Sequence, residues 1–233
     1  MPQTPRQRAR AQTMDDIIRI GRAHLVENGA AALSLRAVAR DLGVVPSAVY
    51  RYVANRDDLL TLLVVDGFDE LGDAVDAALS QAPVGDFRGQ FLLAAHALRA
   101  WALASPATYA LLYGSPVPGY RAPDERTTGP GTRVVRRLIG IWDVAHHDGQ
   151  LALHEVEVPA TLSDDLETIR LELGVRVPDA VLARAATVWA AMIGCVSAEV
   201  FGLYGSDTFA DTGALYDFQL AALADSVGFT SSR

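Results

Sequence analysis

The sequence predicts an all-α protein, with an N-terminal helix-turn-helix domain of three helices and a larger C-terminal helical domain. Apolar residues recur at helical spacing along most of the 233 residues, without convincing strand-type alternation or internal repeats. Half of the residues are apolar, which is enough for a sizeable core. Residues 34–60 have the pattern of two short helices, a tight turn between them, and the start of a third helix.

The N-terminal residues are basic. Residues 1–12 hold three arginines among proline, glutamine and alanine, and we expect a disordered arm there. Such an arm either contacts DNA or merely keeps the chain soluble. The first helix is expected over residues 13–28, where Thr13 and Asp16 resemble a capping box and Asn28 precedes a glycine.

Local sequence signals delimit the two short helices that follow. Ser34 is a good N-cap, because its hydroxyl can accept from a backbone N–H of the first turn. Gly43 tolerates a positive φ and ends this helix. Pro46 suits the first position of the next helix, expected over 46–52. Asn55 is expected to cap the third helix of the unit.

Helical spacing places Val49 and Val53 on the inner face of the 46–52 helix. The residues left on its outer face are small, aromatic or basic: Ser47, Ala48, Tyr50 and Arg51. Two short helices with such an outer face are typical of a helix-turn-helix, whose second helix enters the major groove of DNA. An ordinary helical hairpin within a globular core is the alternative.

The segments 39–44, 47–53 and 55–60 together resemble the N-terminal domain of TetR-type (tetracycline-repressor) bacterial regulators. The resemblance covers about residues 13–62, and the rest matches in length and helical character. It implies a dimeric transcriptional repressor, released from a palindromic operator by a small-molecule effector. This chain has Val45 where the family often has a serine or threonine that caps the helix and contacts phosphate.

The resemblance and the outward-facing pattern together predict the DNA contacts. We expect Ser47 and Tyr50 to meet base edges or the adjacent backbone, and Arg36 to reach the groove from the preceding helix. Phosphate contacts are expected from the side chains of Tyr52 and Arg56. The full predicted set is Arg36, Pro46, Ser47, Ala48, Tyr50, Arg51, Tyr52 and Arg56.

The charge distribution agrees with this interpretation. The chain has a net charge of −8, but residues 1–60 hold nine arginines and six acidic residues, a net charge of +3. The rest of the chain is therefore strongly acidic, and phosphate repels it. An architectural DNA-binding protein is the other alternative, and it would need a basic surface throughout.

We divide the sequence into an arm at 1–12, a DNA-binding domain at 13–60 and a ligand-binding and dimerisation domain at 61–230. The helix expected over 56–80 would act as a lever, which Gly67 and Gly72 either bend or pack closely. Further helices are expected over 87–105, 107–113, 132–147, 162–173, 179–205 and 211–227. Residues 114–131 contain four prolines and four glycines, and we interpret them as a pocket entrance or lid, or else a plain surface loop.

The helix over 179–205 is apolar nearly all round between residues 185 and 198, so it must be covered on every side. We predict that it forms a four-helix homodimer interface with the 211–227 helix and their symmetry mates. The alternative is a central helix buried within a monomer. A dimer also suits DNA reading, because two heads on a two-fold axis bind a palindrome.

Aromatic and polar side chains recur on the helices of the larger domain. An apolar cavity with a few convergent polar groups suits a small molecule, and the resemblance implies such a pocket beside the 56–80 helix. Each residue taken alone also suits an ordinary core. The candidate ligand residues are His96, Trp101, Tyr109, Tyr113, Trp142, Trp189 and Met192.

Other function classes are less well supported. A metal-dependent or other small-molecule enzyme is the main alternative, suggested by His146, His147 and His154, but no HExxH spacing, phosphate loop or GxSxG motif is present. We therefore expect no catalytic residues, cofactor or metal. A single cysteine, no signal peptide and an apolar run of only 14 residues predict a cytoplasmic protein without a membrane span.

Overall fold

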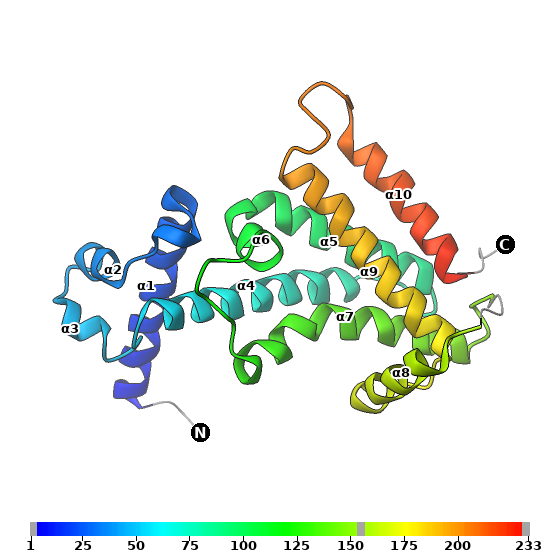
Figure 1. Ribbon diagram of the computed structural model, residues 1–233, viewed down its shortest axis with the longest axis horizontal. Coiled ribbons are helices and arrows are strands. Elements are labelled where there is room, and N and C mark those ends of the chain that lie inside the picture. The colour runs from blue at the N-terminus through cyan, green and yellow to red at the C-terminus, as the bar shows by residue number, and fades with distance from the viewer. Residues whose placement is uncertain (1–3, 153–156, 230–233) are drawn as a thin grey trace. The chain divides into compact units, whose positions relative to one another are not determined.

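Figure 1 shows a computed structural model of the protein, which describes residues 4–152 and 157–229. Every regular element in this part of the chain is helical, apart from one isolated antiparallel bridge between Leu151 and Phe229. The predicted all-α fold is confirmed. The elements are α1 (Pro5–Asn28), the 3-10 turn η1 (Ala30–Ala32), α2 (Leu35–Asp41), α3 (Pro46–Val49), α4 (Arg56–Leu79), α5 (Phe87–Ala104), α6 (Pro106–Tyr113), α7 (Asp124–His147), α8 (Ala160–Leu173), α9 (Asp179–Val200) and α10 (Thr212–Val227).

The chain folds into two compact units. The head unit runs to Glu70 and also includes Ser105–Gly131, while the body unit comprises Leu71–Ala104 and the chain from Thr132 onward. The head unit is thus larger than the 13–60 domain we expected, because α6 and the segment after it pack on its core. The side chains that join this core from that segment are Ala107, Leu111, Val117 and Tyr120.

Helix α1 begins earlier than expected. Residues 5–12, predicted to belong to a disordered arm, are its first turns. The capping box lies at Thr4 rather than at Thr13: Thr4 Oγ1 accepts from the Gln7 amide at 3.3 Å, and Gln7 Oε1 accepts from the Thr4 amide at 2.8 Å. Pro5 occupies the first helical position, where its missing N–H is harmless. Residues 1–3 lie outside the described part of the chain.

The head core fixes α2 and α3. Val49 and Val53 are buried, as predicted, among apolar side chains of α1, α2 and α4. Gly43 has a φ of 72° and turns the chain between α2 and α3. Asn55 caps α4 as expected, since its Oδ1 accepts from the Asp58 amide at 2.9 Å. Ser34 stands at the N-cap of α2 but makes no side-chain cap bond, so that part of the prediction is wrong.

Only the first half of the predicted 114–131 loop is irregular. Helix α7 begins at Asp124 and contains Pro130. Its first turn carries two acidic residues, which favour a helix N-terminus, and Thr127 Oγ1 donates to the Pro123 carbonyl at 2.9 Å. The high proline and glycine content therefore predicted the break at 114–123 but concealed the helix start after it.

Side chains of residues 114–131 bond to the start of α4 and hold it in place. Arg126 donates to the carboxylate of Asp58, which also accepts from the Ala54 amide at 3.1 Å. The hydroxyl of Tyr120 lies 3.1 Å from Thr61 Oγ1. Burial raises the pKa of Asp58, but the hydrogen bonds from Arg126 and Ala54 outweigh it and hold the pKa below its usual value. The N-terminus of α4, directly after α3, is thus held from two sides.

Two glycines of α4 serve close packing. A Cβ on Gly67 would lie 2.6 Å from Thr108 Cγ2 in the head unit. A Cβ on Gly72 would lie 2.6–2.8 Å from the side chain of Arg133 in the body unit. Both distances are shorter than van der Waals contact allows. Close approach therefore accounts for these glycines, the second of the two interpretations offered by the sequence.

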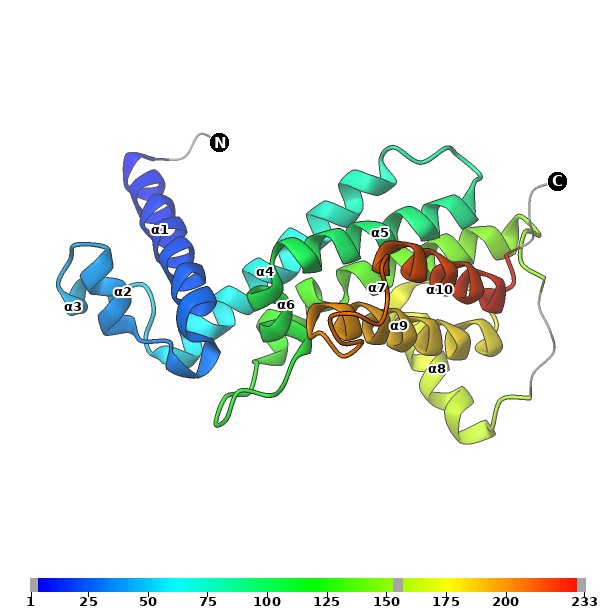
Figure 2. The ribbon, with the colours of Figure 1, turned by 90° about the horizontal axis from the view of Figure 1, so that it is seen from above.

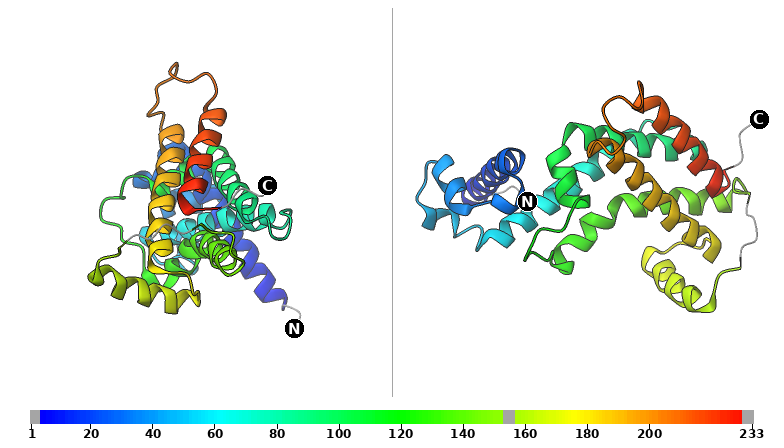
Figure 3. Two further views of the ribbon diagram at one scale, coloured as in Figure 1. Left: turned by 90° about the vertical axis from the view of Figure 1, so that its right-hand side faces the viewer. Right: turned by 45° about the horizontal axis from the view of Figure 1, so that its top comes forward.

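In the body unit, α9 and α10 lie side by side, as Figures 2 and 3 show, and both contact α5. An ion pair joins the three helices: Arg99 donates to both carboxylate oxygens of Glu199 at 2.6 Å, and Thr212 Oγ1 donates to Glu199 Oε1 at 2.6 Å. The hydroxyl of Tyr216 donates to the Ala95 carbonyl at 3.0 Å. These bonds satisfy polar groups that the packing of the helices removes from water.

We predict that Glu199→Gln lowers the free energy of unfolding at neutral pH by about 1–2 kcal/mol, because charge-assisted hydrogen bonds become neutral ones. Hydrogen bonds from Arg99 lower the pKa of Glu199 below its usual 4.5. The stabilisation is therefore fully present above pH 4.5 and is lost as the pH falls through the lower folded-state pKa. Urea unfolding at several pH values measures it, with exposed Glu172→Gln as control. Equal losses at pH 7 and pH 3 would contradict this account.

We predict that Arg126→Ala raises the pKa of Asp58 and speeds hydrogen exchange of the Ala54 amide, because Asp58 loses its cationic partner. The free energy of unfolding should fall by no more than about 1 kcal/mol, since the pair is partly exposed. NMR titration and hydrogen exchange measure both effects. Arg121→Ala, which removes an exposed arginine from the same segment, is the control and should change neither quantity.

Candidate nucleic-acid interface

The outer face of α3 is open to solvent. Pro46, Ser47 and Arg51 are exposed, Tyr50 retains 46% of its accessible surface, and Ala48 is half-buried. The α-helical hydrogen bonds cover Pro46–Val49, and turns carry the chain on to Tyr52, whose amide donates to the Val49 carbonyl at 2.8 Å. The face presents small side chains, which allow close approach, beside one aromatic and one basic group.

Arg36 adds a second exposed positive charge on α2. Within the described part of the chain, neither Arg36 nor Arg51 has a carboxylate within the 4.0 Å of an ion pair, whereas the neighbouring Arg40 pairs with Asp41 at 3.0 Å. Arginines whose charge is not matched by a carboxylate of the same unit remain available for phosphate or base edges. The structure thus leaves two predicted DNA-contacting charges exposed beside α3.

Tyr52 is half-buried against the head core, and the guanidinium of Arg10 lies over its ring, 5.1 Å from the centroid. The helical extension of α1 therefore brings a basic residue next to the end of α3. The sequence indicated basic residues here, but it did not indicate that a helix holds them in place.

Arg56 has an internal role that the sequence did not predict. Its Nη2 donates to the carbonyls of Ala30 and Ala31, each at 3.1 Å, and its Nη1 lies 3.5 Å from Asp57. These bonds tie the start of α4 to η1. Any phosphate contact by Arg56 has to use the remaining N–H groups of the guanidinium, which has five donors.

His24 is a further residue that the sequence analysis missed. It is buried on α1, and its Nε2 lies 2.6 Å from Asp41 Oδ2 at the end of α2. Hydrogen bonds from His24 and then Arg40 lower the pKa of Asp41. The only signal in the sequence was a histidine at helical spacing from Ile17 and Ile20. The pair fixes α2 against α1.

The seven candidate ligand residues are divided between the two units. Tyr109 and Tyr113 belong to the head unit, with ring centroids 5.1 Å apart, and burial raises the pKa of Tyr113. The other five belong to the body unit. Trp142 is buried against Phe91, with centroids 6.2 Å apart. Met192 and Trp101 are also buried, Trp189 is half-buried, and His96 is exposed, 3.4 Å from Asp217.

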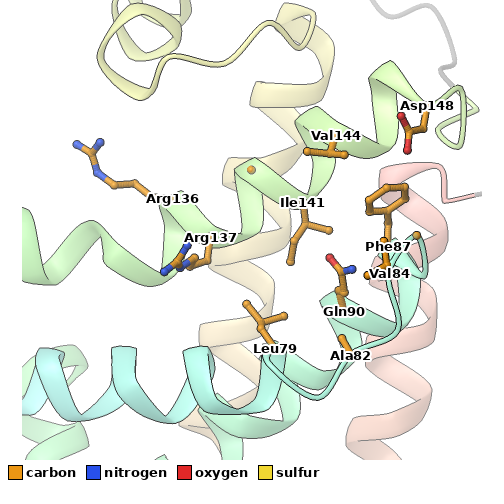
Figure 4. A pocket seen from close by; sticks show the side chains of 12 residues that line it. Leu79, Ala82, Val84, Phe87, Gln90, Arg136, Arg137, Ile141, Val144 and Asp148 are labelled. Carbon is orange, nitrogen blue, oxygen red and sulfur yellow. The ribbon is translucent and has the colours of Figure 1, made fainter.

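The body unit has a groove that none of these seven residues lines. Its volume is about 560 Å³, and Figure 4 shows side chains from α4, the α4–α5 connection, α5 and α7 around it. We call it the body groove. Residues 79–90 and 136–148 meet there, a proximity that separate sequence signals did not reveal. Its lining comprises Leu79, Ala82, Val84, Gly85, Phe87, Gln90, Arg136, Arg137, Gly140, Ile141, Val144 and Asp148.

Among the described residues, no group of three or more histidine, cysteine, aspartate or glutamate side chains is placed to hold a metal ion. His146 and His147 stack edge to face on α7, with ring centroids 6.0 Å apart. His154, the third residue behind the metal alternative, lies outside the described part of the chain.

Comparison with known proteins agrees with this geometry. Residues 17–63 match the family model described as bacterial regulatory proteins of the tetR family, and residues 91–223 match the tetracyclin repressor-like C-terminal domain. The chain is 44% identical over 218 residues to the HTH-type transcriptional regulators Mb1846 of Mycobacterium bovis and Rv1816 of Mycobacterium tuberculosis. Each alignment covers 94% of this chain and 93% of the relative.

The solved structure of the regulatory protein SCO4313 superposes with a TM-score of 0.76 at 32% identity, covering 94% of this chain and 98% of that one. Both family models and the 44% identity thus cover the head and the body alike. The chain therefore belongs to the tetR family of bacterial regulators, helix-turn-helix proteins that bind DNA, control transcription and function as dimers with small-molecule effectors.

Proposed function

We propose that this regulator is a cytoplasmic, homodimeric repressor that leaves a palindromic operator when it binds a small molecule. The main support is the exposed outer face of α3, held on a head core by Val49 and Val53. One such helix contacts only a few base pairs, so two copies on a two-fold axis give the length of a specific site. The acidic remainder of the chain, repelled by phosphate, favours binding through the head.

We propose the following DNA contacts. Tyr50 and Ser47 meet base edges or the adjacent backbone, and Arg36 reaches the groove from α2. Pro46 and Ala48 allow close approach of α3 to the bases. Arg51 and Tyr52 contact phosphates, and Arg56 adds a phosphate contact with the N–H groups that η1 leaves available. Val45, which is exposed just before α3, lacks the hydroxyl that would add a further contact.

We further propose that residues 179–205 and 211–227 form the dimer interface. One face of α9 is buried in the body unit, while its small residues Ala186, Ala190 and Gly194 are exposed. Large apolar side chains are exposed on α10 and after α9, with Phe218 at 76% and Leu203 at 73%. A second copy would remove this apolar surface from water.

The composition of α9 also suits this assignment. By length and composition α9 is apolar enough to cross a membrane, and only 33% of its most apolar window is buried in the protein. A helix between two subunits meets the same criteria, because it is covered by protein on all sides. The tetR family membership favours the interface over a membrane span.

We predict that Arg36→Ala and Tyr50→Ala each lower operator affinity about tenfold or more, since a good base-edge contact contributes about 1–3 kcal/mol. A selection from random DNA first defines the operator, and fluorescence anisotropy then measures affinity. Arg19→Ala, on the exposed face of α1, removes the same charge outside α2 and α3 and is the control. If both variants bind the selected operator as the wild type does, the proposed contacts are wrong.

We predict that Phe218→Asp and Leu203→Asp convert the dimer into monomers, because a carboxylate would be buried in an apolar interface. Analytical ultracentrifugation measures the assembly, and operator affinity should fall with it. Leu171→Asp on α8 is a matched control, since Leu171 and Leu203 have the same exposed fraction, 73%. A dimer that survives both interface substitutions, or is broken equally by Leu171→Asp, would rule out this interface.

A further inference from the structure

We propose that the body groove binds an organic monoanion with an apolar tail, such as a medium-chain carboxylate. The proposed function would make such a molecule an effector, and the inference rests on it only to that extent. Binding itself depends on the body unit, because every residue that lines the groove belongs to that unit. The volume of about 560 Å³ lies within the range of small-molecule sites.

The apolar side chains that line the groove are the reason for proposing an apolar tail. Leu79, Phe87 and Ile141 form its sides, and Val84 and Val144 add apolar side chains that are exposed to solvent. Val84 is fully exposed and Val144 is 49% exposed. An alkyl chain lying between α4, α5 and α7 would remove these groups from water, which is favourable. The open side of the groove allows the chain to enter without unfolding a helix.

The charged side chains at and beside one end of the groove are the reason for proposing a ligand with an anionic head group. Arg133 donates to Asp73 at 2.7 Å and to Asp76 at 2.6 Å, and Arg137 donates to Asp76 at 2.6 Å. Two carboxylates thus pair with two arginines. The nearby Arg136 donates to the neutral hydroxyl of Thr132 at 3.1 Å instead.

No carboxylate in the described part of the chain lies within ion-pair distance of Arg136. Arg136 is exposed on α7, one residue from Arg137, so its long side chain can turn toward a ligand at the groove. One net positive charge therefore remains at this end. A carboxylate can accept two hydrogen bonds from a guanidinium, which favours it over a neutral head group.

The other end of the groove sets the orientation of the ligand. Figure 4 shows Arg137 at one end of the groove, with Arg136 beside it and its guanidinium directed away from the other labelled side chains, and Asp148 at the opposite end. Asp148 repels a second negative charge there. The arrangement therefore favours one anionic head group at the arginine end, with a tail that is uncharged at its far end.

The test measures binding of decanoate to the purified full-length protein by isothermal titration calorimetry, in the absence of DNA. Decanol and decyltrimethylammonium provide the same tail with a neutral and a cationic head. We expect decanoate to bind about tenfold more tightly than either, because a charge-assisted hydrogen bond corresponds to at least that ratio. Since no operator is needed, a failure of the proposed function does not affect this measurement.

Two kinds of variant locate the site. Arg136→Ala should weaken decanoate about fivefold to tenfold and leave decanol unchanged, with Arg176→Ala as the charge-matched control in the same unit. Gly140 lines the groove, and a Cβ there meets no atom within 4 Å, so Gly140→Leu should fill the groove without disturbing the core. It should reduce decanoate affinity by more than about tenfold. Val144→Asp, at a partly exposed position, should do the same by repulsion.

The proposal is overturned if the wild type does not bind decanoate at millimolar concentration, or if the three probes bind equally well. It is also overturned if Gly140→Leu and Val144→Asp, both shown to be folded by circular dichroism, bind decanoate as the wild type does. Loss of decanoate binding in these variants with retention in Arg176→Ala supports it.

Discussion

A four-residue helix is not stable by itself in water, and the structure of the head unit depends on this constraint. Helix α3 spans only Pro46–Val49, far fewer residues than an isolated helix needs. Its geometry therefore depends on the burial of Val49 and Val53 among the side chains of α1, α2 and α4. The residues between and beside these two valines are left on the outside. The same contact that stabilises α3 thus also exposes the side that we propose contacts DNA.

Hydrogen bonds and ion pairs between side chains orient the helices on this apolar core. The His24–Asp41 pair fixes α2 against α1, and Arg56 fixes the start of α4 to η1. Asp58 links the same start to Arg126. Each tie is partly exposed and contributes little to the free energy of unfolding by itself. Hydrogen bonds nevertheless restrict orientation more than apolar contacts do, so together they limit how α2 and α3 can turn on the head core.

The body unit differs from the head unit, because apolar side chains of α9 and α10 remain exposed to solvent in a single copy. The buried face of α9 forms its core, whereas the exposed small residues of α9 and the aromatic side chain of Phe218 remain at the surface. The polar Arg99–Glu199–Thr212 cluster joins α5, α9 and α10. An exposed apolar face of this kind suits a self-complementary interface. The body groove lies on other elements, α4, α5 and α7, so a ligand there need not compete with the proposed interface.

The sequence alone determined the all-α class, the helix-turn-helix, the inward valines and the turn at Gly43, because these follow from local signals: helical periodicity, capping residues and positive φ. It did not predict the start of α1 at Pro5 or of α7 at Asp124, where proline-rich composition outweighed weaker capping signals. Only the tertiary structure decided the roles of Arg56 and His24 and the existence of the body groove. Those features depend on which side chains from distant segments meet, and the long-range packing that brings them together leaves no periodic pattern in the sequence.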